Sequence, residues 1–333
     1  RMISVIDCHD RYEIVRLIAE GGMGAVFEAK KIGEAGFEKV VALKMLLPKY
    51  SADPVFIGNF IREAKLVANL IHENIVQIYQ LSRCPEGYYF VMEFVDGISL
   101  HDFVEFHRRV GRRLPVNLAV FIASRAARAL AYAHSRRGAD GVPLGIVHCD
   151  ICPRNILINT EGVPKITDFG IARVATAGAA ADGKVTGKVA FMAPEQAASG
   201  TVDFRADVYA LGMVLFLLLS DHPARNLRQP LTGIVEDVRH NRIEWEQLPA
   251  DLPEELRALL HRMLLADPPA RCSDTAELAT ELEYFIYKDG SGPTIVTLAD
   301  YMRKLMPGRF GAEPASDAGT PELDRTVVLD HQP

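Results

Sequence analysis

Residues 147–158 read VHCDICPRNILI. Within this stretch, Asp150 and Asn155 put a carboxylate and a carboxamide on one short segment that leads into an apolar run. This spacing is typical of an active-site loop. Cys149 and Cys152 stand on either side of the aspartate, so the rest of the chain has to decide whether the loop is active, damaged or something else.

The bulk composition indicates an ordinary globular protein. Of 333 residues, 49% are hydrophobic and 24% are charged, which is usual for folded domains. The net charge of −6 gives no reason to expect nucleic acid or anionic lipid as a partner. Five cysteines, scattered and odd in number, favour a reducing cytoplasm over a disulfide framework.

No stretch of the sequence predicts a membrane span. The longest apolar run, VYALGMVLFLLL at 208–219, is too short to cross a bilayer and predicts a buried helix. The sequence leaves open whether a membrane anchor or a sensor domain follows residue 333, and it does not give the oligomeric state.

The chain divides into three regions by its hydrophobic pattern. Residues 11–95 read mostly as strands, with one helix predicted over 53–70. Residues 96–288 are mainly helical. The extension 289–333 opens with the turn-forming DGSGPT. It continues with a helix predicted over 297–306, which would pack on the helical region or mediate an assembly contact, and then with a Pro-, Gly- and acid-rich tail expected to be disordered.

A glycine-rich turn, AEGGMGAV at 19–26, follows one predicted strand and precedes another. A dinucleotide-binding fingerprint would lead into a helix, so that interpretation fails. Gly21, Gly22 and Gly24 lack a Cβ and would let backbone amides approach phosphates closely. The alternative for this motif alone is a plain tight hairpin.

The segment VALK places Lys44 in the middle of an apolar strand. A buried ammonium without a partner is costly, so the lysine must find an anion, and Glu63 on the following helix is a candidate. The alternative is a lysine at a strand edge whose side chain reaches water. The glycine-rich turn nearby makes this alternative less favoured.

These motifs, in their order, resemble those of a eukaryotic-type (Hanks-type) bacterial serine/threonine protein kinase over about residues 11–288. The ordered set is GGMGAV, VALK, REA, MEFVDG, HCDICPRN, DFG, MAPE, DVYALG and DPPAR. The resemblance implies an α+β fold with two lobes: a small β-rich lobe with one helix over 11–95 and a larger, mainly helical lobe over 96–288.

The resemblance implies a role for each matching position. Lys44 would hold the α- and β-phosphates of ATP and pair with Glu63, and Asp150 would accept the proton of the substrate hydroxyl. Asn155 and Asp168 would ligate Mg²⁺ or Mn²⁺, which prefer oxygen ligands. The other nucleotide-binding positions would be Ala19, Gly21, Gly22, Gly24, Val26, Ala42, Met92, Glu93, Val95 and Leu157.

It also implies structural contacts. Glu195 and Arg271 would form a buried ion pair in the helical lobe, and Asp207 would brace the backbone of the catalytic loop. His148 would be a hydrogen-bonded core residue. Taken singly, Asp168 could equally be a helix cap or a turn residue; only the ensemble of motifs favours the catalytic interpretation.

Three positions depart from the family pattern. Ala19 stands at the first loop glycine and should only stiffen the loop. Cys149 replaces the arginine that receives an activation-loop phosphate, and a neutral thiol cannot clamp a dianion. Thr176 and Thr186 remain possible autophosphorylation sites, but ordering by phosphate should be weak or absent.

The third departure is Cys152, which replaces the lysine that neutralises the transferring phosphate. Losing one such contact typically costs about 10²- to 10³-fold in rate. Lys188, in VTGKVAFMAPE, stands where most serine/threonine kinases have threonine, and its long side chain could supply the missing charge. The alternative is a solvated loop lysine.

Cys149 and Cys152 also form a C-x-x-C pair around Asp150. A redox switch is one hypothesis, but reactive pairs sit at helix N-termini that lower a thiol pKa. This loop should be extended, so two free thiols are expected.

Thr320 and Thr326 in the tail are candidate docking points for phosphothreonine-reading domains, with an inert linker as the alternative.

The sequence thus predicts a cytoplasmic kinase that phosphorylates serine or threonine in proteins, with ATP and Mg²⁺. One rival is a pseudokinase acting as a nucleotide-binding scaffold, suggested by Ala19, Cys149 and Cys152. A second rival is a small-molecule kinase on the same fold, which generally lacks the APE motif and the arginine that pairs with it; Glu195 and Arg271 argue against this rival.

Overall fold

The computed structural model describes residues 5–7, 10–21, 24–46, 50, 54–85, 87–169, 186–198 and 201–311. Within these ranges the side chains of residues 5–7, Val55, Asn59, Glu63 and Thr186 are not described.

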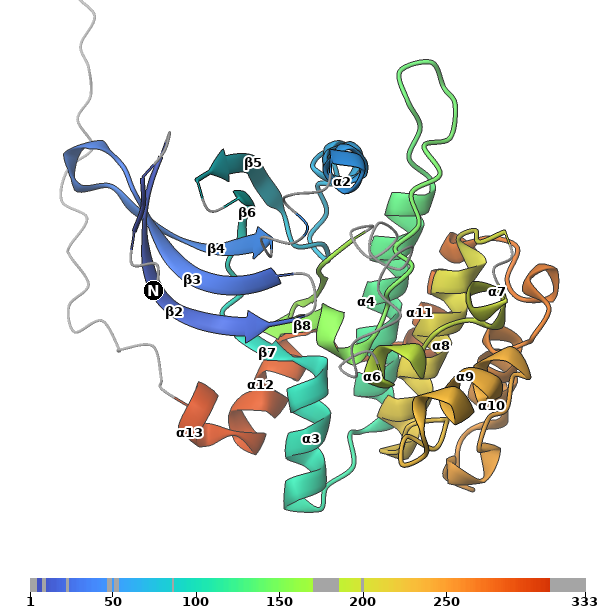
Figure 1. Cartoon of the computed structure of the whole chain (residues 1–333). Coiled ribbons are helices and arrows are strands. Elements are labelled where there is room, and N and C mark those ends of the chain that lie inside the picture. Colours follow the sequence, from blue (N-terminus) through green and yellow to red (C-terminus); the bar gives the residue numbers. More distant parts are fainter. Residues whose placement is uncertain are drawn as a thin grey trace, which may run out of the picture.

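The first part of the chain forms an antiparallel sheet with one helix beside it (Figure 1). The strand order is β1-β2-β3-β4-β6-β5. The elements are β1 Val5–Asp7, β2 Arg11–Glu20, β3 Gly24–Ile32, η1 Glu34–Gly36, β4 Glu38–Leu46, α2 Pro54–Val67, β5 Ile78–Cys84 and β6 Gly87–Glu93. The predicted strand–turn–strand arrangement around the glycine-rich segment is confirmed.

Helix α2 packs on this sheet through the face that the sequence predicted. Phe56, Phe60, Ala64 and Val67 recur at helical spacing, and all four are buried. The Phe60 ring lies 4.8 Å from the ring of Phe90 on β6, centroid to centroid. Aromatic and aliphatic burial therefore holds α2 against the sheet.

The second part is mainly helical and surrounds two buried helices. Its helices are α3 Leu100–Val110, α4 Val116–His134, α6 Thr186–Val189, α7 Pro194–Ala197, α8 Arg205–Ser220, α9 Leu231–Arg239, α10 Glu254–Met263 and α11 Thr275–Tyr287. Short 3-10 turns lie at η2 Pro153–Asn155, η4 Trp245–Gln247 and η5 Pro268–Ala270. A small antiparallel sheet consists of β7 Gly97–Ser99, β8 Ile156–Asn159 and β9 Pro164–Ile166, and the loop that contains Asp150 leads into its central strand, β8.

Helix α8 is apolar on all sides, and nearly every residue in it is buried. It packs against α4, α10 and η5, so the run at 208–219 is a core helix, as predicted. Among the described residues, no helix combines the length and apolar character that a bilayer crossing requires.

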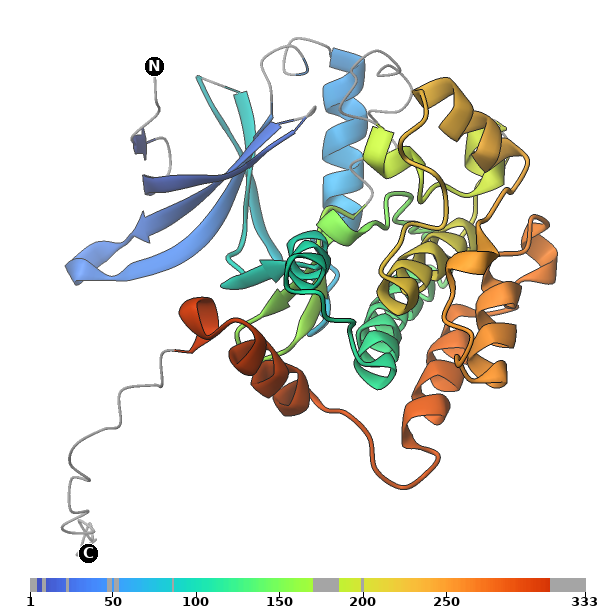
Figure 2. The same ribbon diagram turned by 90° about the horizontal axis from the view of Figure 1, so that it is seen from below.

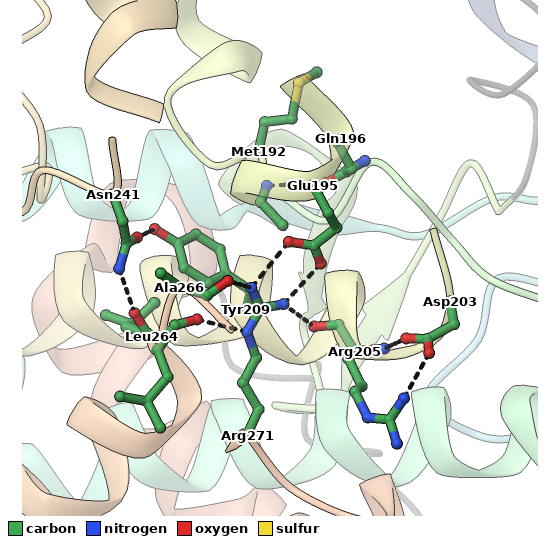
Figure 3. Close-up of polar contacts among 12 residues, drawn as sticks. Met192, Glu195, Gln196, Asp203, Arg205, Tyr209, Asn241, Leu264, Ala266 and Arg271 are labelled. Atoms are coloured by element: carbon green, nitrogen blue, oxygen red, sulfur yellow. Dashed lines mark hydrogen bonds and ion pairs between the residues drawn. The ribbon is translucent and has the colours of Figure 1, made fainter. Parts of the chain in front are cut away.

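A buried ion pair links three segments of the helical part (Figure 3). Arg271 Nη1 and Nη2 donate to the Glu195 carboxylate at 2.8 and 2.9 Å. The Arg271 side chain is 0% exposed and also donates to the backbone carbonyls of Arg205, Leu265 and Ala266. The predicted ion pair is confirmed, and every N–H donor of the guanidinium is used.

The C-terminal extension folds back beneath the sheet. Helices α12 Ile295–Leu305 and α13 Pro307–Phe310 lie beside α3 and β7 (Figures 1 and 2). The predicted helix over 297–306 is confirmed, and it packs on the helical part. The expectation of disorder from Pro307 onward is wrong for residues 307–310, because buried Leu305 and Met306 hold this turn against the protein. Thr320 and Thr326 lie outside the described residues.

Candidate active site

A cavity of about 680 Å³ lies where the sheet meets the helical part. The described residues of the predicted site that line it are Ala19, Gly21, Gly24, Val26, Ala42, Lys44, Met92, Glu93, Val95, Asp150, Asn155, Leu157, Asp168 and Lys188. Gly22 and Thr176 lie outside the described residues. A second cavity, of about 730 Å³ beside β5, is lined by none of the predicted residues.

Strand register brings the sheet residues of the cavity together. Val26 lies opposite Lys44, and Ala42 lies opposite Met92. Opposed residues in an antiparallel pair share a face, and so do residues two apart along one strand. Val26, Ala42, Lys44 and Met92 therefore project from one face of the sheet, toward the helical part.

Gly24 has a structural reason to lack a side chain. A Cβ built on it would lie 2.0 Å from the backbone oxygen of Met45, because β3 and β4 cross closely there. A Cβ on Gly21 would come no nearer than 4.0 Å to another atom. Close packing of β3 and β4 is therefore enough to explain why position 24 is glycine, whether or not a phosphate binds nearby.

Residues 93–97 connect the sheet to the helical part and line the cavity. The Glu93 side chain is turned to Lys165, whose Nζ lies 2.9 Å from Oε1, and the Glu93 amide donates to the carbonyl of Gln77. The backbone of residues 93–97 is therefore the part of this connection that can offer hydrogen bonds to a bound ring.

Asp207, in the first turn of α8, braces the loop that carries Asp150. Its Oδ2 accepts from the His148 amide at 2.7 Å, and its Oδ1 accepts from the Cys149 amide at 2.8 Å. Burial opposes ionisation of Asp207, but the bond from His134 and the loop contacts outweigh it, so its pKa lies below the ordinary value. The two bonds hold Cys149 at a φ of +63°, a conformation that costs free energy outside glycine. The predicted brace is confirmed, and His148 is a buried core residue as expected.

Asp150 receives two further contacts at the cavity. Asn155 Nδ2 donates to the Asp150 backbone oxygen at 2.7 Å and to its Oδ2 at 2.9 Å. Lys188 Nζ lies 2.5 Å from the same Oδ2. Burial lowers the pKa of Lys188, but the Asp150 carboxylate more than offsets this and raises it overall. The lysine is therefore cationic at neutral pH.

Lys44 and Asp168 form a second ion pair. Lys44 Nζ lies 2.6 Å from Asp168 Oδ1, and Lys44 is 8% exposed. Burial works against ionisation of Asp168, but Lys44 dominates and keeps its pKa below the ordinary value. Glu63 belongs to α2, but its side chain is outside the described set, so its pairing with Lys44 stays a prediction.

The oxygen atoms at this end of the cavity suit a hard divalent cation. The Asn155 amide nitrogen is engaged by Asp150, which leaves its Oδ1 as the end able to coordinate. Within the described part of the chain, Lys44 contacts one oxygen of Asp168, and the second can serve as a ligand. The residues therefore fit Mg²⁺ or Mn²⁺.

The cysteines next to Asp150 do not have the properties of a redox pair. Cys152 is a free thiol. Cys152 is 2% exposed, and burial, aided by the Asp150 charge, raises its pKa to about 12. Since the thiolate is the reactive form, this arrangement argues against the redox-switch hypothesis.

Sequence reasoning missed several residues of the cavity. Thr167 and Val76 line it, and so do Arg309 and Phe310 from α13. The amphipathic pattern of the extension predicted a packed helix, but no local signal indicated where it would dock.

Comparison with known proteins agrees with this geometry. The sequence profile of the protein kinase domain matches residues 12–285. The tyrosine-protein kinase MasK of Myxococcus xanthus is 36% identical over 94% of this chain. The serine/threonine-protein kinases PknB of Mycolicibacterium smegmatis and PrkC of Bacillus subtilis are 33% and 30% identical over 96% and 97%.

The chain spans about half the length of these curated relatives: 48% of MasK, 49% of PknB and 48% of PrkC. Among solved structures, the kinase domain of PknI from Mycobacterium tuberculosis superposes with a TM-score of 0.61 at 27% identity. The match covers 85% of this chain and 98% of that domain. The sheet, the helical part and the cavity between them are thus the two lobes and cleft of a kinase fold, and the chain belongs to the protein kinase family, among the eukaryotic-type (Hanks-type) kinases of bacteria.

Proposed function

We propose that this chain is an active kinase domain that transfers the γ-phosphoryl group of ATP to serine or threonine hydroxyls of proteins. The observation that carries the proposal is the convergence on Asp150 Oδ2 of the Asn155 amide and the Lys188 ammonium, at 2.9 and 2.5 Å. The same cavity contains the Lys44–Asp168 pair.

Asp150 is the group that takes the proton of the acceptor hydroxyl in this proposal. Its backbone is anchored by Asn155, and its side chain is only 13% exposed. A carboxylate held in this way meets its substrate without reorganisation, which is how positioned groups accelerate a reaction.

Lys44 is proposed to hold the α- and β-phosphates, while Asn155 and Asp168 hold the metal. A Mg²⁺ or Mn²⁺ held by these residues would offset the negative charge of the phosphates. The apolar walls, Val26, Ala42 and Leu157, would enclose the purine, and the backbone of Glu93 and Val95 would bond it.

Lys188 is proposed to supply the charge that the family usually places two residues after the aspartate. Cys152, at that position, is neutral because burial raises its pKa to about 12. The Lys188 ammonium lies beside the carboxylate that the missing lysine would neighbour. This contact supports relocation of one cation from the catalytic loop to α6, and it counts against a solvated loop lysine.

The acceptor residue needs its own test, because the relatives are named for different acceptors. PknB and PrkC are named serine/threonine-protein kinases, whereas MasK is named a tyrosine-protein kinase. The segment GKVAFMAPEQ favours serine or threonine. Phosphoamino-acid analysis of a labelled general substrate should show phosphoserine or phosphothreonine; phosphotyrosine alone would contradict this assignment.

Several finer points belong to the same proposal. Autophosphorylation at Thr176 or Thr186, docking of phosphothreonine-reading domains on the tail, lobe limits at residues 95 and 288, and a cytoplasmic location remain proposals. Free thiols at Cys152 and Cys272 suit a reducing compartment.

The test is a γ-labelled ATP assay on wild type, Lys188→Ala and Asp150→Asn. Wild type should transfer phosphate, and Asp150→Asn should be nearly inactive. Lys188→Ala should lose about 10²- to 10³-fold in rate, as expected for removal of one electrostatic contact to developing charge. Lys39→Ala removes an exposed lysine that lies over Tyr79, away from the cavity, and should keep the wild-type rate.

The outcomes separate the hypotheses. A wild type that binds ATP without turnover would support the pseudokinase. A wild-type rate in Lys188→Ala would end the relocation idea and leave the kinase assignment standing. Cys152→Lys in the Lys188→Ala background should restore part of the activity, because it returns the ammonium to its usual place.

A further inference from the structure

The C-terminal extension is firmly docked on the helical lobe. Leu298 and Met302 of α12 are at most 1% exposed, and Leu305 and Met306 are also buried. The Thr294 hydroxyl accepts from the Thr297 amide and caps the helix. Burial of this apolar face gives the extension a defined position instead of leaving it as a loose appendage.

Specific contacts set where the helix lies. Tyr301 Oη is 2.8 Å from His107 Nε2 on α3. A Cβ on Gly162, in the turn between β8 and β9, would lie 2.1 Å from the backbone oxygen of Ile295. The start of α12 therefore approaches this turn as closely as backbone can, and its middle is tied to α3.

The docked segment delivers α13 to the nucleotide cavity. Arg309 Nη2 donates to the backbone oxygen of Gly97 at 2.8 Å. Phe310 is half-buried, and its ring lies 5.4 Å from the Arg309 guanidinium carbon. Both side chains line the cavity that contains Lys44 and Asp150. Figure 2 shows α13 below the sheet, at the end of the extension.

These two residues lie outside the part of the chain that the kinase profile matches. The kinase profile ends at residue 285, and α13 begins at Pro307. Among the described residues, Arg309 has no carboxylate partner, so its fixed contacts are the Gly97 carbonyl and the Phe310 ring. Its charge is not needed for a structural ion pair.

We propose that α13 is the outer wall of the nucleoside site, and that Arg309 and Phe310 are positioning residues for a bound purine nucleoside triphosphate. Phe310 would cover the edge of the nucleoside and exclude water from it. Arg309 would hold α13 against Gly97, two residues beyond Val95. The proposal rests on the proposed function, because it takes the cavity to be an ATP site.

The test is direct nucleotide binding, measured by calorimetry with ATP and Mg²⁺ on the full chain. Phe310→Ala and Arg309→Ala should raise the Kd about three- to thirtyfold, as expected for loss of one partly buried contact. Val296→Ala and Arg303→Ala are matched controls in α12, where both residues are exposed, and they should bind as wild type does. Phe310→Leu should restore part of the affinity.

A structural role alone would give a different pattern. Without nucleotide, Phe310→Ala and Arg309→Ala should unfold thermally at the wild-type midpoint, and only the ATP-induced rise in the midpoint should shrink. If both variants bind ATP as tightly as the controls, the proposal is overturned while the kinase assignment stands. If wild type does not bind ATP, the proposed function fails and this proposal fails with it. If wild type binds ATP but does not transfer phosphate, only the kinase assignment fails.

Discussion

The lysine beside Asp150 comes from a different segment of the chain than in the usual family pattern. Asn155 belongs to the same loop and is buried, whereas Lys188 comes from α6 and its side chain is 45% exposed. A lysine at position 152 would move with the catalytic loop. A lysine on α6 supplies its charge only when that segment lies over the loop, so the proposed relocation would couple catalysis to the position of residues 186–189.

His107 gives a prediction about pH at the residue scale. Its Nδ1 lies 2.7 Å from the Phe103 carbonyl oxygen and must donate, so Nε2 accepts from Tyr301 at 2.8 Å. Burial lowers the pKa of His107 below its ordinary 6.5, and the Phe103 bond and Asp221 oppose this only in part. Protonation would put a donor where the structure uses an acceptor.

The sign follows from proton binding. Between the lowered pKa of the folded state and the unfolded value of 6.5, the unfolded chain binds more protons than the folded chain. The free energy of unfolding therefore rises with pH in this window, and the contribution of His107 reaches its full value above pH 6.5. Urea unfolding should therefore show lower stability at pH 5.5 than at pH 7.5. His107→Gln should reduce this difference without abolishing it, because burial also lowers the pKa values of His72 and His101. An unchanged difference in the variant would contradict the prediction.

The cavity residues illustrate what the sequence could predict. Lys44, Asp150 and Asp168 sit in motifs whose order along the chain is shared with a large family, so their meeting in one cleft followed from the fold. Arg309 and Phe310 carry no such motif. Their place depends on how α12 docks on α3, a tertiary contact that local patterns do not encode.

At the scale of elements, the helical lobe is tied together through Arg271. Its guanidinium joins α7, α8 and the loop before η5 by one ion pair and three backbone contacts (Figure 3). A buried ion pair need not stabilise a protein relative to an apolar replacement, but breaking it leaves one charge without a partner.

Arg271→Leu should therefore lower the free energy of unfolding by about 3–5 kcal/mol, because it strands the Glu195 carboxylate. The double variant Arg271→Leu/Glu195→Leu should lose less than the sum of the two single variants, since no charge is left unpaired. Arg239→Ala, which removes an exposed partner of Glu236, should change stability by no more than about 0.5 kcal/mol. Chemical denaturation of the wild type, the two single variants, the double variant and Arg239→Ala measures these terms, and strictly additive losses at positions 195 and 271 would refute the coupling.

Prediction of elements succeeded where periodicity was strong and failed where the element was short. The apolar run of α8 and the spaced aromatic residues of α2 predicted both helices. Helix α13 has four residues and contains Pro307 and Gly308, which favour a break in the chain. Its helical turn forms because buried Leu305 and Met306 hold it in place, and that information lies in the packing.

At the scale of the whole molecule, the extension is a brace at the junction of the lobes. It contacts α3 through Tyr301, the β8–β9 turn through Ile295, and the lobe connection through Arg309. Of these contacts, the one between Arg309 and Gly97 lies at the cleft itself. The extension therefore belongs to the folded kinase, although the family profile does not include it.

This role predicts that one truncation weakens the protein and that a shorter truncation leaves it unchanged. A chain ending at Lys288 loses α12 and α13 and leaves their apolar sites on α3 open to water, so its thermal midpoint should fall by about 4–8 °C, corresponding to a loss of about 2 kcal/mol. Its Kd for ATP and Mg²⁺ should also rise. A chain ending at Gly311 keeps every contact of the extension described above and should match the full chain in both measurements.

Scanning calorimetry with and without nucleotide compares the three proteins directly. Equal midpoints and affinities in all three would mean that the extension contributes to neither stability nor the nucleotide site, whereas loss of affinity only in the shorter chain ties the cleft to a segment beyond the end of the family profile.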